Sequence, residues 1–166
     1  MSRITGYPLQ RNLTAYCYRL AFFKVASFSL LLFTSFANAQ GTVGADLEVL
    51  VQDLRNNSGS LGCQIFASEA GFPRNNVQAF AAVVSSITAG TARCQFKNLA
   101  PGQYAVSVMH DENSNHKLDS NFLGVPTEGY GASNNKTYAL SPPKWEESHF
   151  TLVAGDKKSL TIKLRY

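Results

Sequence analysis

Alternation of apolar and polar residues is the dominant pattern after residue 39. In residues 46–52, Leu47, Val49 and Val51 alternate with polar side chains. A period of two places apolar side chains on one face of a β-strand. Similar alternation or short apolar runs predict six further strands, over residues 61–66, 82–88, 91–96, 104–109, 149–153 and 160–164.

Turn-forming residues between these segments indicate how the strands connect. Residues 56–59 predict a hairpin between the first two strands, and residues 154–156 predict another between the last two. A short helix is predicted over residues 75–81. Seven short strands of this kind predict an all-β fold: an antiparallel seven-stranded sandwich, immunoglobulin-like or prealbumin-like, with one long polar loop.

The long polar loop spans residues 111–144 and interrupts the strand pattern. It is rich in Gly, Asn, Ser and Pro. Such long connections are uncommon in small domains unless they have a function. Tyr130, Tyr138 and the adjacent Trp145 are candidate binding residues, because aromatic rings can stack on a sugar or close over a peptide. The alternative is that these rings pack the loop onto the sandwich.

Residues 1–39 are expected to be a signal peptide. Their only charges are positive and precede the apolar run 25–36, which ends at the small-x-small sequence of residues 37–39. The run is shorter than the roughly 18–20 residues that span a bilayer, so cleavage is favoured over anchoring. The alternative is a buried N-terminal helix. Cleavage would leave residues 40–166 as a single periplasmic or secreted domain with no membrane span.

Cleavage also changes the charge of the chain. The whole sequence has 15 basic and 11 acidic residues and a net charge of +4. Four of the basic residues and none of the acidic ones precede residue 40, so the mature chain is formally neutral. The basic balance that would indicate nucleic-acid binding therefore disappears, and no nucleic-acid partner is expected.

Two cysteines remain after cleavage, Cys63 and Cys94, each within an alternating segment. An oxidising compartment favours their pairing. A bridge closing about 30 residues would stabilise the fold by roughly 3–4 kcal/mol on the chain-entropy model. Two separate buried thiols are the alternative.

Residues 110–119, HDENSNHKLD, contain oxygen donors at a spacing that a calcium ion can use. Calcium takes six to eight oxygen ligands at about 2.3–2.6 Å. The candidate donors are Asp111, Asn113, Asn115, the main-chain carbonyl of Lys117, Asp119 and, from further along the loop, Glu128.

An EF-hand is excluded, because His116 and Phe122 occupy the positions that need Gly and Glu. With so few carboxylates, calcium affinity would be weak, on the order of 10⁻⁵–10⁻³ M. The alternative is that the Asp and Asn side chains bond to their own backbone in successive Asx turns.

Catalytic motifs are sparse. The sequence has no Gly-x-Ser-x-Gly elbow and no phosphate-binding glycine loop. A hydrolase-like domain could still use His110, Asp111, Glu128 or His149, and His110, Asp111 and His149 could form a zinc or iron site if their strands are neighbours. An enzyme of this kind needs a titratable pair in a concave pocket.

Several segments resemble one known family. Residues 99–106, LAPGQYAV, are similar to the turn that begins a central strand in prealbumin-like domains. Followed by HDENSNHKLD, GVPTEGYGASNN and PPKW, they resemble the bacterial exported family catalogued as domain of unknown function 2141. The resemblance covers nearly all of the mature chain and implies a secreted or periplasmic β-sandwich with a shared polar loop, but no activity.

One position departs from the family pattern. His116 stands where the family usually has Gly, so a positive φ there would have an energetic cost. Together the observations predict an exported non-enzymatic module that binds a protein or glycan of the envelope or medium through residues 111–145, with calcium as a candidate stabiliser. The alternatives are the hydrolase-like enzyme and a purely structural accessory domain whose loop is a rigid cap.

Overall fold

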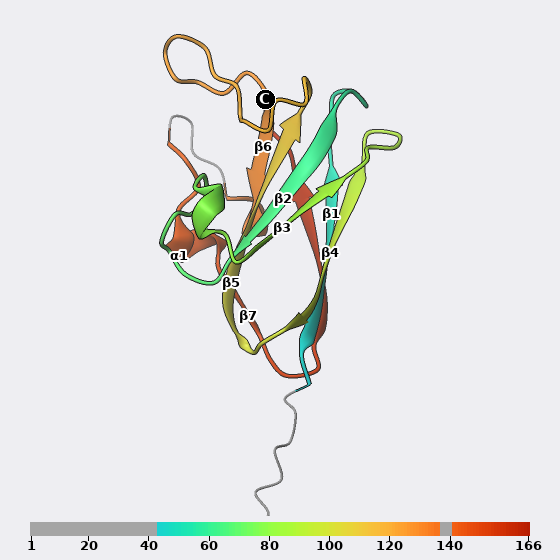
Figure 1. Cartoon of the computed structure of the whole chain (residues 1–166), viewed down its shortest axis with the longest axis vertical. Helices are drawn as coiled ribbons and strands as arrows, with labels where there is room; N and C mark the ends of the chain where they lie inside the picture. Colours follow the sequence, from blue (N-terminus) through green and yellow to red (C-terminus); the bar gives the residue numbers. More distant parts are fainter. Residues whose placement is uncertain (1–42, 137–140) are drawn as a thin grey trace, which may run out of the picture. The chain divides into compact units, whose positions relative to one another are not determined.

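Eight strands form two β-sheets in the computed structural model, which describes residues 43–136 and 141–166 (Figure 1). The strands are β1 Ala45–Gln52, β2 Ser60–Phe66, β3 Ala81–Ser85, β4 Ala92–Leu99, β5 Gly102–Asp111, β6 Gly129–Ala132, β7 Phe150–Leu152 and β8 Lys157–Lys163. The three-stranded sheet has the order β4-β1-β8. The five-stranded sheet has the order β3-β2-β5-β6, and β7 also pairs with β5. The predicted signal peptide, residues 1–39, lies outside the described residues.

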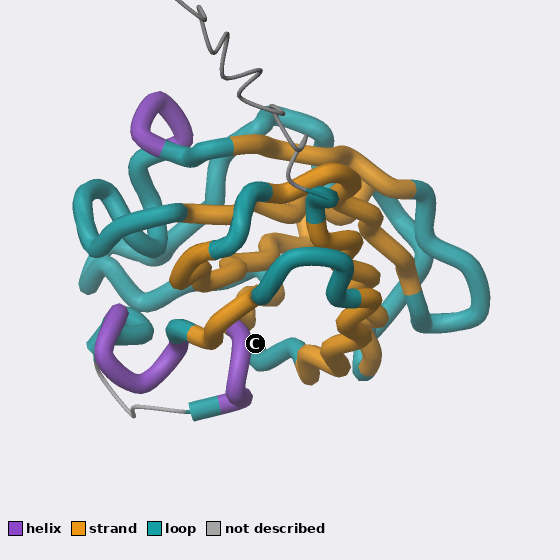
Figure 2. Tube along the Cα trace, turned by 90° about the horizontal axis from the view of Figure 1, so that it is seen from below, coloured by secondary structure: helices purple, strands orange, loops and turns teal. Residues whose placement is uncertain are grey.

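Helical structure in the described part of the chain is limited to three short turns: η1 Asn76–Gln78, η2 Ser133–Asn135 and α1 Trp145–Ser148. Figure 2 shows these turns at the periphery of the strands. No helix within residues 43–136 and 141–166 is both long and apolar enough to cross a membrane.

The core lies between the two sheets. The alternation in β1 directs Leu47, Val49 and Val51 inward, where each is at most 1% exposed. Burying one such side chain contributes roughly 1.5–3 kcal/mol. Cys63 of β2 and Cys94 of β4 form a disulfide across this core. Because β2 and β4 belong to different sheets, the predicted bridge is confirmed and links the two layers.

Both predicted hairpins were wrong, although all seven predicted strands exist. β1 and β2 lie in different sheets, because the connection of residues 53–59 is longer than the usual two- to five-residue hairpin loop and crosses between layers. β7 pairs with β5, whereas β8 pairs with β1. Backbone bonds from Gly155 to Val43 and from Asp46 to Asp156 tie the β7–β8 turn to the start of β1.

The other strand pairs are antiparallel, as predicted, but the β1–β8 pair is parallel and departs from the predicted antiparallel sandwich. An eighth strand, β6, lies within the predicted loop and pairs with β5. Its sequence, GYGA, is too short and too rich in glycine to show alternation. Gly129 has a packing reason: a Cβ atom there would lie 2.6 Å from the Tyr166 ring. The predicted helix over 75–81 is only the single turn η1, because β3 already begins at residue 81.

Candidate functional site

The loop of residues 112–128 connects β5 to β6 at one end of the sheets (Figure 1). Asp111, at its start, is 2% exposed. Its two carboxylate oxygens accept the backbone N–H groups of Asn115, at 3.0 Å, and His116, at 2.8 Å. These bonds hold His116 at φ 62°, a left-handed conformation that glycine adopts without strain.

Glu128 fixes the other end of the loop. It is 4% exposed, and its oxygens accept the backbone N–H groups of Glu112, at 2.8 Å, and Asp119, at 3.0 Å. Hydrogen bonds to charged groups contribute about 1.5–3 kcal/mol each. Two buried carboxylates therefore fix the backbone of a loop that has little apolar packing of its own.

The remaining predicted side-chain donors for calcium are hydrogen-bonded within the loop. Asn113 Oδ1 accepts the N–H of Asn115 at 3.1 Å, and Asn115 Oδ1 accepts the N–H of Lys117 at 2.8 Å. The carboxylate of Asp119 accepts both asparagine side-chain amides, at 2.7 and 3.0 Å. Within residues 43–136 and 141–166, no group of three or more His, Cys, Asp or Glu is arranged to hold a metal ion. Calcium binding stays a prediction.

The two histidines of the predicted catalytic and metal sets, His110 and His149, lie near opposite ends of β5. His110 is fully buried, its Nε2 donates to the Ser58 carbonyl at 2.8 Å, and its Nδ1 lies 2.7 Å from the Tyr166 hydroxyl. His149 directly precedes β7, which pairs with the opposite end of β5 at Tyr104. Six residues of strand separate the two positions by about 20 Å.

A charged cluster joins the C-terminus to the base of the loop. Arg55 pairs with Glu112 at 2.6 Å, and its guanidinium lies 4.4 Å from the centre of the Tyr166 ring. Burial alone would raise the pKa of Glu112, but the hydrogen bond from Asn56 and the contact with Arg55 hold it below the ordinary value of 4.5. Burial raises the pKa of Tyr166 above its ordinary value of 10.0.

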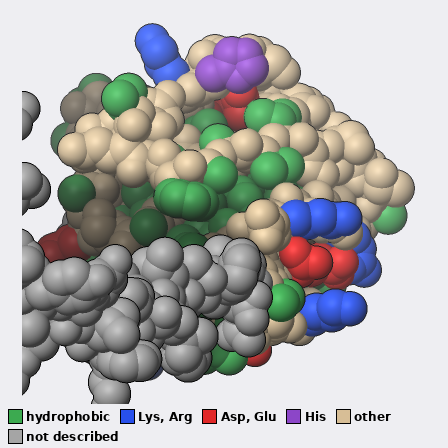
Figure 3. All heavy atoms as spheres, turned by 60° about the horizontal axis from the view of Figure 1, so that its bottom comes forward, with side chains coloured by type: hydrophobic (Ala, Val, Ile, Leu, Met, Phe, Trp, Pro, Cys, Tyr) green, Lys and Arg blue, Asp and Glu red, His purple; other side chains and the backbone are tan. Residues whose placement is uncertain are grey.

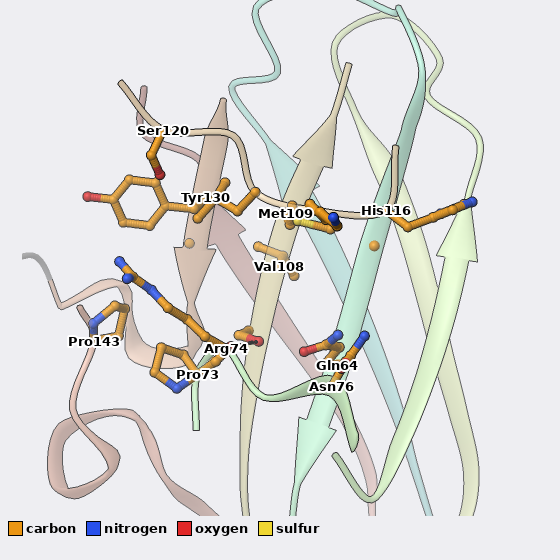
Figure 4. A pocket seen from close by; sticks show the side chains of 15 residues that line it. Gln64, Pro73, Arg74, Asn76, Val108, Met109, His116, Ser120, Tyr130 and Pro143 are labelled. Atoms are coloured by element: carbon orange, nitrogen blue, oxygen red, sulfur yellow. Dashed lines mark hydrogen bonds between the residues drawn. The ribbon is translucent and has the colours of Figure 1, made fainter. Parts of the chain in front are cut away.

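A cavity of about 360 Å³ lies on the outer face of the five-stranded sheet, beside the loop (Figure 4). Its floor comes from β2, β5 and β6, whose outward-facing positions meet at Gly62, Met109 and Tyr130 through the strand register. The lining residues are Gly62, Gln64, Pro73, Arg74, Asn76, Ser107, Val108, Met109, His116, Lys117, Leu118, Ser120, Tyr130, Gly131 and Pro143.

The wall opposite the loop is held by two kinds of contact. The Ser107 hydroxyl donates to the Pro73 carbonyl at 2.9 Å. The Phe72 ring packs edge-on against Phe66 and Trp145, with ring centres 5.4 and 6.0 Å apart. Arg74 is the next residue after Pro73, so these contacts also fix the backbone from which its side chain extends. Trp145, predicted to bind a ligand, therefore supports the wall from behind.

The other two predicted binding residues have different outcomes. Tyr130 lines the cavity, as Figure 4 shows, whereas Tyr138 lies outside the described residues. Sequence reasoning missed Gln64, Arg74 and Met109 as lining residues. The outward positions of Gln64 and Met109 follow from strand alternation, but their proximity to Tyr130 depends on the pairing of β2, β5 and β6, which the sequence does not specify.

The tip of the loop exposes apolar side chains on a fixed backbone. Phe122 is 95% exposed and Leu123 is 71% exposed. The side-chain oxygen of Asn121 accepts the N–H groups of Leu123, at 3.0 Å, and Val125, at 3.1 Å, which closes a tight turn. Apolar side chains held in solvent this way are typical of a contact surface.

The fold and the loop define a small all-β domain with a fixed polar loop. The family described as "Uncharacterized protein conserved in bacteria (DUF2141)" matches residues 49–161. The chain belongs to this family. The comparisons with curated proteins and with solved structures find no match.

Proposed function

We propose that this protein is an exported, non-enzymatic recognition module, periplasmic or secreted, that binds a protein partner or a glycan through residues 111–145. We further assign its two sheets to the immunoglobulin-like or prealbumin-like sandwiches. The Tyr104 hydroxyl donates to the Ala100 carbonyl at 2.9 Å, which is similar to the tyrosine corner of immunoglobulin-like domains. The disulfide supports an oxidising compartment.

One observation underlies the proposal: a loop fixed by buried carboxylates exposes Phe122 and Leu123 at its tip. Ordering a loop costs conformational entropy, about 1–2 kcal/mol per residue for the backbone. A loop that is already ordered binds a partner without meeting that cost again. The fixed apolar tip is therefore suited to recognition.

The hydrolase-like alternative has less support. Of its four residues, His110, Asp111 and Glu128 are buried, and their side-chain atoms bond to protein groups. Such groups hold the loop in place, whereas a catalytic acid or base must reach a substrate.

Binding to purified bacterial cell-wall sacculi and to membrane vesicles tests the proposal in a co-sedimentation assay. The wild-type protein is expected to sediment with one of these, and the variant with Phe122→Ser and Leu123→Ser should bind at least tenfold more weakly. Val153→Ser is the matched control, because Val153 is an exposed apolar residue on the β7–β8 turn. Equal sedimentation of wild type and tip variant, or none by either, would leave the loop as the rigid cap of a structural accessory domain.

Calcium stabilisation of the loop is a separate prediction. Asp111 and Asp119 supply carboxylates that could bind the ion beside the Asn113 and Asn115 oxygens. A melting scan in millimolar calcium, repeated in chelator, tests this prediction because a ligand that binds only the native state raises the melting temperature. A higher melting temperature in calcium supports calcium binding. Superimposable scans favour the alternative, in which the Asx turns alone hold the loop.

A further inference from the structure

We propose that the cavity on the outer face of the five-stranded sheet binds an acidic saccharide, meaning a sugar ring that bears a carboxylate. The inference rests on the proposed function, because one wall of the cavity belongs to the loop of residues 112–128. It adds the chemical class of the ligand to that function.

The charge of the cavity indicates an anionic ligand. Arg74 from one wall and Lys117 from the other line the same space, and none of the described lining residues is Asp or Glu. The side chains of Arg74 and Lys117 form no hydrogen bond or ion pair within the described residues. In Figure 4 the Arg74 side chain extends toward Tyr130, into the space between the walls. A guanidinium can donate two parallel bonds to a carboxylate.

The other polar groups indicate a sugar. Gln64, Asn76, Ser120 and Tyr130 line the cavity, and none of their side-chain polar atoms has a hydrogen-bond partner within the described residues. Amides and hydroxyls both donate and accept, as sugar hydroxyl groups do. A simple inorganic anion would leave most of these groups unused.

Apolar surface and volume agree with this class of ligand. Met109 and Tyr130 are paired across β5 and β6, and both side chains contribute apolar surface to the cavity. Such surface can pack against the C–H face of a sugar ring. A volume of about 360 Å³ lies at the lower end of the range of about 300–1,000 Å³ for ligand sites. The cavity is therefore sized for one small ligand or one unit of a polymer.

Titration of the mature protein with glucuronate, glucose, acetate and inorganic phosphate, followed by two-dimensional NMR, tests the inference. We expect glucuronate to bind at least tenfold more tightly than each of the other three probes. Arg74→Gln should weaken glucuronate binding at least tenfold without lowering the melting temperature, because Arg74 is exposed. Arg93→Gln, the same change on the other sheet, should leave binding unchanged.

Three results would overturn the inference. If acetate or phosphate binds as tightly as glucuronate, the cavity is an anion site without sugar recognition. If glucose binds as tightly as glucuronate, charge is irrelevant. If Arg74→Gln binds glucuronate as tightly as wild type, the ligand lies elsewhere. Failure here is distinct from failure of the proposed function. If sacculi or vesicles bind in a manner that depends on Phe122 and Leu123 while glucuronate does not bind, only the ligand class is wrong.

Discussion

The outer faces of the two sheets have hollows of nearly equal volume but different charge. The hollow on the three-stranded sheet, about 380 Å³, has Asp46, Glu48 and three lysines in its lining. Glu48 accepts bonds from Arg93 and Gln95, and Asp46 accepts the N–H of Asn98. Figure 3 shows acidic side chains lying between basic ones on one side of the molecule.

The cavity beside Arg74 on the five-stranded sheet lacks this internal neutralisation. None of its described lining residues is Asp or Glu, and the side-chain polar atoms of Gln64, Asn76, Ser120 and Tyr130 have no hydrogen-bond partner within the described residues. Volume alone therefore does not identify a binding site. A site needs polar groups whose bonding capacity the protein itself leaves unused.

The largest expected effect acts on both faces at once. Replacing Cys63 and Cys94 together by Ala removes the bridge between the sheets and should lower the free energy of unfolding by about 3–4 kcal/mol. Urea denaturation followed by fluorescence and by circular dichroism measures this change. Both signals should shift together, since one core supports both faces. Separate transitions for the two sheets would contradict a shared core.

A second change should affect only the cavity side. Glu128→Gln puts an amide where one backbone N–H now donates to a carboxylate, at a cost of about 2–3 kcal/mol. Hydrogen exchange should accelerate at the amides of Glu112 and Asp119 and stay slow at Glu48 in β1. Glu146→Gln is the control, because Glu146 is exposed. Unchanged exchange at residues 112 and 119 would show that Glu128 does not fix the loop.

Acid should also weaken the loop side first. Because the pKa of Glu112 is lowered in the folded state, its contribution to stability is present above about pH 4.5 and is lost as the pH falls through the folded-state value. Melting temperatures between pH 6 and pH 3 should therefore fall less for Glu112→Gln than for wild type. Parallel curves for the two proteins would exclude this contribution.

The smallest effect is expected on the three-stranded sheet. Arg93→Gln removes an exposed ion pair with Glu48, and such pairs contribute about 0.2–1 kcal/mol. The melting temperature should shift slightly at low salt, and the shift should shrink as salt screens the pair. A loss of stability much larger than 1 kcal/mol would contradict the expectation that an exposed ion pair contributes little.

The sequence predicted the elements of this fold better than their pairing. Alternation identified seven strands, because inward residues such as Val49 and Ile65 follow a strict period of two. The pairing of a strand depends on which sheet the preceding connection leads into. A turn sequence predicts that the chain reverses direction, but it does not say which strand the next one pairs with. The disulfide was predictable because Cys63 and Cys94 both occupy inward positions of alternating segments.

The site was predictable only in part. The polar stretch from Asp111 to Asp119 showed where the loop is, and Tyr130, predicted to bind a ligand, lines the cavity. Arg74 was missed because it lies far away in sequence and has no motif. Its place in the cavity depends on contacts of Phe72 and Ser107 that only the folded chain creates.

Backbone NMR shifts of isotope-labelled protein comprising residues 40–166, recorded during titration with a glucuronate-containing oligosaccharide, compare the two hollows directly. We predict shifts at Gln64, Met109 and Tyr130 and none at Glu48 or Gln95. Shifts on the three-stranded sheet alone, or on neither sheet, would contradict the assignment of the Arg74 cavity on the five-stranded sheet as the binding site.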